Sequence, residues 1–132
     1  MTLPIETTKA TQDAAFDLLV VFTQPPLTAS LPKEGLDLAL VSSTFEQSTG
    51  LIFLGAGVLQ LSPNQQPDCL ALKGTQAMLK ALALYGIDKV FVETQALVDY
   101  GLTANNLLLP VISQNTQELQ ALIANSRNTL TF

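Results

Sequence analysis

The sequence predicts an α/β fold: a three-layer sandwich in which helices flank a mostly parallel sheet of about five strands. Two observations support this prediction. Short apolar runs alternate along the chain with longer segments of helical periodicity, and Gly, Pro or polar residues separate them. Short apolar runs are typical of strands buried on both faces, and strands that alternate with helices favour parallel pairing. The 132 residues fit a single domain over residues 15–132, after a probable flexible N-terminal tail of residues 1–14.

Five segments are predicted as strands. The runs AFDLLVVF (15–22), LIFLGAG (51–57) and KVFVET (89–94) are rich in Leu, Val, Ile and Phe. NLLLPVI (106–112) is expected to be a shorter strand, and RNTLTF (127–132) alternates apolar and polar residues as a half-covered strand does.

Four segments are predicted as helices, because their apolar residues lie near helical spacing. They are residues 33–47, a segment from Gln66 or Thr75 to Gly86, residues 95–101 and residues 114–126. Ser113 is expected to be the N-cap of the last helix.

Charge and residue usage exclude several classes of function. Eleven acidic residues against six basic residues give a net charge of -5, which opposes direct binding to nucleic-acid phosphates. Histidine is absent, so the chain lacks the usual proton shuttle at neutral pH and the side chain of a Ser-His-acid triad. A single cysteine cannot build a thiolate zinc site. We therefore expect no metal and no other cofactor.

Hydropathy and charge density predict the location and the assembly state. The sequence has neither an 18-residue apolar run nor a recognisable secretion signal, so we expect a cytoplasmic protein without membrane association. Charged residues make up only 13% of the chain and hydrophobic residues 48%. We therefore expect part of the apolar surface to be buried between subunits of an oligomer.

The stretch Gly55-Ala56-Gly57 raises the question of nucleotide binding. A dinucleotide fingerprint needs a third glycine where this chain has Gln60, and it needs a helix that begins at these glycines. Apolar residues rather than a helix are expected after Gly57, and no P-loop motif occurs. We therefore reject a phosphate site and expect the two glycines to let a helix or a partner backbone approach the strand end.

Several segments occur in an order and spacing shared with a known family. They are LPKEGLDLAL, GVLQL followed by the turn PNQQPD, ALALYGIDKVFVETQALVDYGL, and an aromatic residue after the last strand. Together they resemble the TusC/DsrF family of sulfur-relay proteins, within the DsrE/DsrF-like superfamily. The resemblance leaves out only residues 1–14.

The resemblance implies a fold of the DsrE/DsrF type and a hetero-oligomer with a DsrE/TusD-like and a DsrH/TusB-like subunit; a homo-oligomer in isolation is the alternative. In the Tus branch such a complex passes persulfide sulfur toward 2-thiouridine at the tRNA wobble position. In the Dsr branch it serves sulfur oxidation. The sequence does not distinguish the two branches, and tRNA thiolation is the preferred interpretation.

The resemblance also implies where a related chain carries sulfur. In the DsrE/TusD sister subunit, the sulfur-carrying cysteine follows the third strand, eight residues before a glycine. Eight residues before Gly101, this chain has Glu93. A carboxylate cannot hold a persulfide, so we expect this chain not to carry the sulfur. Glu93 is expected to face an interface or to cap the helix at Gln95.

Cys69 is the only thiol and therefore the only possible persulfide site, although a weak candidate. A carrier needs an accessible thiolate with a lowered pKa, and the neighbouring Asp68 opposes this, although Lys73 is expected one turn away. Most lone cysteines behave as small buried hydrophobic residues. The preferred function is therefore a non-catalytic structural subunit.

Two alternatives remain open at this point. One is a sulfurtransferase subunit with a persulfide on Cys69, and the other is a small-ligand-binding α/β module that uses the loops beyond the strand ends. The oligomer interface is expected to include the segment 53–68. The candidate interface residues are Phe53, Gly55, Gly57, Gln60, Pro63, Gln65, Pro67 and Asp68.

Overall fold

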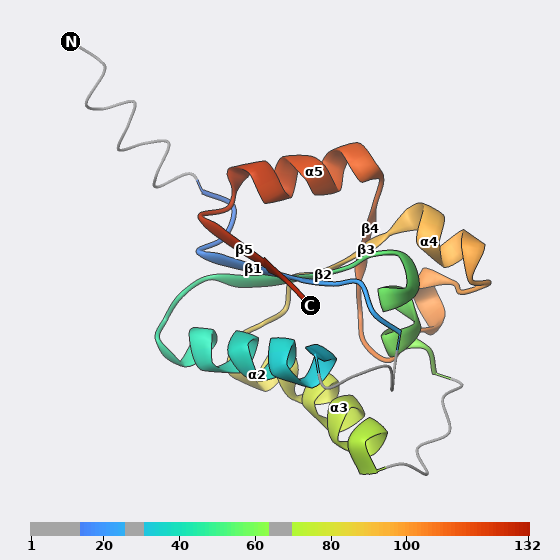
Figure 1. Cartoon of the computed structure of the whole chain (residues 1–132), viewed down its shortest axis with the longest axis horizontal. Coiled ribbons are helices and arrows are strands. Elements are labelled where there is room, and N and C mark those ends of the chain that lie inside the picture. The colour runs from blue at the N-terminus through green and yellow to red at the C-terminus, as the bar shows by residue number, and fades with distance from the viewer. Residues whose placement is uncertain (1–13, 26–30, 64–69) are drawn as a thin grey trace.

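The computed structural model describes residues 14–25, 31–63 and 70–132, with the backbone alone described for residues 31–32 and 70–75 (Figure 1). These residues form one sheet of five strands in the order β4-β3-β2-β1-β5, and every neighbouring pair is parallel. The strands are β1 (Leu18–Phe22), β2 (Thr49–Phe53), β3 (Val90–Glu93), β4 (Ile112–Gln114) and β5 (Asn128–Thr131). The predicted α/β class and five-stranded parallel sheet are confirmed.

Helices cover both faces of this sheet. The α-helices are α2 (Leu31–Thr44), α3 (Leu70–Ala81), α4 (Thr94–Asp99) and α5 (Thr116–Asn125), and the 3-10 helices are η1 (Gly55–Leu61), η2 (Leu82–Tyr85) and η3 (Ala104–Asn106). Figure 1 shows α2 and α3 on one face and α5 on the other, so the three-layer arrangement is confirmed. Within the described residues, no helix is long and apolar enough to cross a membrane.

The apolar runs of the strands fill two cores, because successive side chains point to opposite faces of a sheet. Val20, Phe22 and Phe53 are fully buried on the α2 and α3 side, where the two phenyl rings stack 4.8 Å apart. Leu19 and Ile52 point to the α5 side. Each such side chain contributes roughly 1.5–3 kcal/mol by leaving water. Burial on both faces explains why these strands are continuously apolar in sequence.

Two predicted strands differ from the structure. The segment 51–57 leaves the sheet after Phe53 and turns into η1. Of the segment 106–112, only Ile112 belongs to a strand. Pro110 has no N–H to donate to a sheet ladder, and the three leucines that precede it are partly buried against the larger core instead. The apolar character of this segment therefore reflects packing rather than strand pairing.

The start of α5 also differs from the prediction. Ser113 is part of β4, and Asn115 is the N-cap. The Asn115 side chain accepts a hydrogen bond from the Glu118 N–H at 2.8 Å, while the Glu118 carboxylate accepts one from the Asn115 N–H at 2.9 Å. This reciprocal capping box satisfies two backbone donors, which a serine two residues earlier cannot reach.

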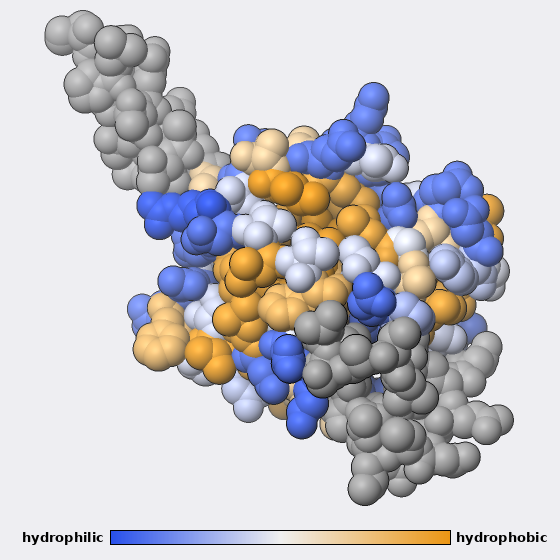
Figure 2. Space-filling model, in the orientation of Figure 1, coloured by the Kyte–Doolittle hydropathy of each residue, from blue (hydrophilic) through white to orange (hydrophobic). Residues whose placement is uncertain are grey.

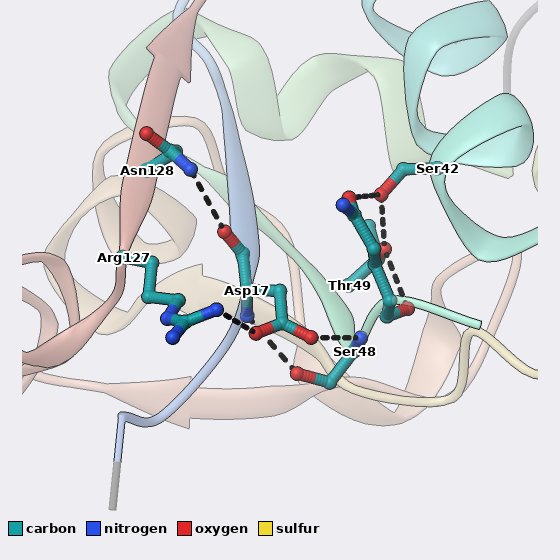
Figure 3. A network of polar contacts seen from close by, with 7 residues as sticks. Asp17, Ser42, Ser48, Thr49, Arg127 and Asn128 are labelled. Carbon is teal, nitrogen blue, oxygen red and sulfur yellow. Dashed lines mark hydrogen bonds and ion pairs between the residues drawn. The ribbon is translucent and has the colours of Figure 1, made fainter. Parts of the chain in front are cut away.

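A polar network holds the amino ends of β1, β2 and β5 together (Figure 3). The Asp17 N–H donates to Ser48 Oγ, and the Asp17 carboxylate accepts from the Ser48 N–H, both at 3.0 Å. Arg127 lies 3.7 Å from the same carboxylate. Beside this group, the buried hydroxyls of Ser42 and Thr49 are 3.0 Å apart. The network ties three segments that are distant in sequence at one end of the sheet.

Candidate functional site

The carboxyl ends of the five strands lie together at the opposite end of the sheet, because all the strands run in the same direction. Loops at this end usually carry the functional residues of parallel α/β proteins. Here the end of β2 continues into Gly55-Ala56-Gly57, β3 ends at Glu93, and β4 leads to Thr116. These residues form the candidate site.

Gly57 is required by the close approach of two backbones. A side chain at this position would overlap the carbonyl group of Phe22, at the end of β1. That carbonyl also accepts a hydrogen bond from the Leu54 N–H at 2.9 Å. Gly55 has open space around it but adopts a positive φ of 49°, which glycine tolerates best. Gly57 therefore allows a close backbone approach, as expected, but from the end of β1 rather than from a helix or a partner; Gly55 instead serves the turn into η1.

The prediction that no helix begins at these glycines was wrong, since η1 starts at Gly55. Phosphate binding gains no support from this correction. The Gly55 N–H at the start of η1 donates a hydrogen bond of 3.1 Å to Glu93 Oε1. A carboxylate of the chain itself therefore already occupies the position where an anion would be held.

Glu93 joins three elements at the carboxyl end of the sheet. Its Oε1 accepts from the Gly55 N–H, and its Oε2 accepts from the Thr116 hydroxyl in the first turn of α5, at 3.4 Å. Glu93 is the N-cap residue of α4, as expected, but within the described residues its side chain makes no hydrogen bond to the first turn of that helix. An ionised carboxylate is an acceptor only, so it suits these two donors. The arrangement holds η1 and α5 in place and offers no nucleophilic sulfur.

Gln60 and Gln114 are further polar residues near this end. Gln60 is buried, and its Nε2 donates to the Gln24 carbonyl at 2.9 Å, which ties η1 to the segment after β1. Gln114 lies opposite Glu93 in the register of β3 and β4. Its Oε1 is buried and has no hydrogen-bond partner among the described residues. Sequence reasoning missed Gln114 and Thr116, since no motif marks either residue.

The structure describes only some of the predicted interface residues, and not all of those are exposed. Phe53, Gly57 and Gln60 are buried inside the fold and do not form part of the described surface. Gly55 and Pro63 are partly exposed. The remaining candidates lie outside the described residues: Gln65, Pro67, Asp68 and the thiol candidate Cys69.

An apolar surface on α4 adjoins η1. Val98 is 67% exposed, and Tyr100, which follows the helix, is 44% exposed, although both side chains are large and hydrophobic. Val98, Tyr100, Gly55 and Pro63 together define what we call the η1–α4 surface. Side chains of this kind are enriched where protein partners bind.

A small-ligand site at the carboxyl end of the sheet has less support than a protein interface there. Two hollows on the described surface lie toward the amino ends of the strands. One, of about 260 Å³, is lined by residues such as Leu82 and Val90, and the other, of about 410 Å³, by residues such as Val41 and Leu130. In the described part of the chain, no three His, Cys, Asp or Glu residues lie close enough to hold a metal ion.

Comparison with known proteins agrees with this geometry. The DsrE/DsrF-like family matches residues 17–132. The chain is 34% identical to a TusC homologue from Pseudomonas aeruginosa over 115 residues, which is 87% of this chain and 97% of that protein. It is 35% identical to a TusC homologue from Vibrio vulnificus over 115 residues, covering 87% and 98% of the two chains.

The fold is also similar to that of solved structures. The ychN protein from E. coli superimposes with a TM-score of 0.76 at 19% identity, over 88% of this chain and 98% of that one. A conserved protein of unknown function from Bacteroides thetaiotaomicron gives a TM-score of 0.61 at 16% identity, over 88% and 95%. The chain belongs to the DsrE/DsrF-like family, and its relatives within that family are TusC homologues.

Proposed function

We propose that this chain is a non-catalytic subunit of a cytoplasmic sulfur-relay complex that serves the 2-thiolation of the tRNA wobble uridine. Its relationship to TusC homologues supports a sulfur-relay subunit. The proposed role is to complete an assembly in which another subunit carries the persulfide.

The contacts of Glu93 carry this proposal. The resemblance to the TusC/DsrF family places Glu93 where the sister subunit has its sulfur-carrying cysteine. In this chain the carboxylate binds the Gly55 N–H and the Thr116 hydroxyl, so the position is used to hold η1 against α5. Sulfur transfer needs a thiolate, and an oxygen acid cannot form a persulfide.

The partners of the proposed complex are a DsrE/TusD-like subunit and a DsrH/TusB-like subunit. The η1–α4 surface is our candidate for contact with them, because Val98 and Tyr100 are exposed on and after α4, and α4 contacts η1, in which Gly55 is partly exposed. The chain's net charge of -5 favours contact with protein rather than with tRNA phosphates. We therefore assign tRNA contact to other members of the complex.

Reconstitution of the complex from purified subunits tests this proposal. The complex is loaded with labelled sulfur from a persulfide donor, and the label is followed into tRNA as 2-thiouridine. We expect omission of this chain to stop transfer, and Cys69→Ser to leave it nearly unchanged. If Cys69→Ser stops transfer while the complex stays intact by gel filtration, the non-catalytic role is wrong. If the label never enters tRNA although sulfur reaches the carrier subunit, the tRNA assignment is wrong.

A further inference from the structure

The first described residues lie beside the amino end of β5. The Ala15 N–H donates to the Asn125 carbonyl at 2.8 Å, and the Arg127 N–H donates to the Phe16 carbonyl at 2.9 Å. In Figure 1 the start of the described chain lies next to this strand. The preceding residues, 1–13, lie outside the described part of the chain. They are therefore tethered to the sheet at the edge that β5 forms.

An exposed apolar surface lies at the same edge. A hollow of about 410 Å³ is lined by residues of α2 and β5, and its described lining carries no charge. Val41 and Phe45 in this lining are 53% and 74% exposed, and Leu130 is 46% exposed. Figure 2 shows hydrophobic residues gathered across the middle of the face between α5 and α2, with hydrophilic residues mainly toward its margins. Large hydrophobic side chains exposed together mark a surface to which another segment or protein binds.

The hollow lies within reach of the segment 1–13. Leu18 and Asn128, the first residues of β1 and β5, both line it. Four positions separate Leu18 from Ala14, where the described chain begins, whereas nine separate Ala14 from Ile5. At about 3.3 Å per residue, these lengths correspond to roughly 13 Å and 30 Å of extended chain. The segment is therefore long enough to turn back and reach the hollow.

The sequence of this segment supplies an apolar occupant and a polar connection. Leu3-Pro4-Ile5 is uncharged and apolar, and the proline ring fixes one backbone angle, which reduces the entropy lost on docking. The connection, Glu-Thr-Thr-Lys-Ala-Thr-Gln-Asp over residues 6–13, contains no large apolar side chain. Only the first part of the segment therefore matches the apolar hollow.

The segment is also an addition to the domain that relatives share. The DsrE/DsrF-like match begins at residue 17. The TusC homologue from Pseudomonas aeruginosa aligns over 97% of its own length with 115 residues of this chain. Residues 1–16 thus lie before the length that the family match covers. A role for them belongs to this chain rather than to its family.

We propose that the segment 1–13 folds back over the edge of the sheet, and that Leu3 and Ile5 dock into the hollow between α2 and β5 of the same chain. A short tether gives the segment an effective concentration on the order of 1 mM at the hollow. A second copy or another apolar protein has no such advantage, and this difference selects the chain's own segment as the occupant. The docked segment covers Leu130, so a protein that binds the β5 edge must first displace it.

Other surfaces of the described chain suit the segment less well. The hollow of about 260 Å³ has Lys80 and Asp88 in its lining and lies against β3 and the residues before β4. The strand β4 forms the opposite edge, roughly 19 Å across a sheet of five strands. The η1–α4 surface lies at the carboxyl end of the strands, whereas the segment is attached at the amino end. The proposal does not depend on the proposed function.

Nuclear magnetic resonance of the full chain tests the docking directly. We expect nuclear Overhauser effects between the methyl groups of Ile5 and those of Val41 and Leu130, with intensities per molecule that do not change on dilution. In a mixture of labelled and unlabelled chains, an isotope-filtered experiment should show none of these contacts between chains. Absence of the contacts, or contacts that occur only between chains, would overturn the proposal.

Paired substitutions in the full chain separate apolar docking from a general effect of charge. Leu3→Asp combined with Ile5→Asp should lower the ratio of docked to free segment at least about tenfold, because two apolar side chains no longer leave water. Thr7→Asp combined with Thr8→Asp is the matched control, since it adds the same charge within the connection and should keep the contacts. Leu130→Asp should lose them from the side of the hollow, with unchanged amide signals in β1 to β3 showing that the fold is intact. Contacts that survive the first pair of substitutions, or that the control loses equally, would contradict docking by Leu3 and Ile5.

Discussion

The amino and carboxyl ends of the parallel strands are held by different sets of polar contacts. At the amino end, Asp17 makes three hydrogen bonds with Ser48 and faces Arg127, and the Ser42 and Thr49 hydroxyls add a neighbouring contact (Figure 3). At the carboxyl end, the single side chain of Glu93 joins η1 to α5. At the amino end, side chains from three segments contact one another, whereas at the carboxyl end one carboxylate links η1 to α5 and Gln60 separately links η1 to the segment after β1.

We interpret the amino end of the sheet as the end whose polar contacts maintain the fold, and the carboxyl end as the one where subunits of the family can differ in function. A network of several contacts tolerates the loss of any one of them. In the proposed function, Glu93 stands at the position of the sister subunit's sulfur-carrying cysteine, and its carboxylate accepts hydrogen bonds where a thiol would carry sulfur. The carboxyl end is also where parallel α/β proteins usually place their functional groups.

Gly57→Ala is expected to have the largest effect on the stability of the carboxyl end. The added methyl group would overlap the Phe22 carbonyl, which is backbone and cannot move aside easily. We expect a loss of about 3 kcal/mol or more in the free energy of unfolding, measured by urea denaturation. Gly55→Ala is the control, since its surroundings are open and only its positive φ opposes a side chain, at a cost of about 1–2 kcal/mol. Equal losses for the two variants would contradict the close backbone approach.

Asp17→Ala tests the network at the amino end. The substitution leaves the Ser48 N–H without its carboxylate acceptor and removes the ion pair with Arg127. We expect a loss of about 1–2 kcal/mol in the free energy of unfolding. Arg127→Ala should cost less than about 1 kcal/mol, because the pair is exposed and 3.7 Å apart. If Arg127→Ala costs as much as Asp17→Ala, the ion pair contributes the stability and the hydrogen bond from the Ser48 N–H to the Asp17 carboxylate contributes little.

Glu93→Gln is expected to have a smaller effect on stability and a local effect on dynamics. Glutamine keeps an acceptor oxygen for the Gly55 N–H, and its amide N–H can donate to the Thr116 hydroxyl oxygen, so both contacts remain but without the negative charge that strengthens them. We expect a loss of about 1 kcal/mol and faster amide exchange at Gly55, with no change at the amino end. Unchanged exchange at Gly55 would show that Glu93 does not hold η1.

Sequence reasoning correctly predicted the strands in which every successive residue is buried, on one face of the sheet or the other. β1 and β3 are apolar on both faces, so their sequences indicate strands without reference to any distant contact. The segment 106–112 is just as apolar but packs its leucines against the core from outside the sheet, a difference that hydropathy does not record. The turn at Gly55 also depends on a distant residue, since its first N–H is satisfied by Glu93, 38 positions further along the chain.

The candidate site was predictable only in part for the same reason. Glu93 was found through the family resemblance, whereas its contacts with Gly55 and Thr116 depend on the meeting of β2, β3 and α5. Local sequence indicated Glu93 as the N-cap residue of α4, which it is, but did not indicate that its side chain contacts distant residues instead of the first turn of the helix. The predicted interface included Phe53 and Gln60, but Phe53 is buried at the end of β2 and η1 turns the Gln60 side chain into the fold.

The central claim is that sulfur passes through the proposed complex without being covalently bound to this chain at any step. Intact-mass spectrometry of every subunit, after the complex is loaded from a persulfide donor and quenched with a thiol-blocking reagent, tests this claim most directly. We predict that the mass of additional sulfur appears on the DsrE/TusD-like partner and not on this chain. Additional sulfur on this chain during turnover, lost in Cys69→Ser together with transfer, would contradict the account.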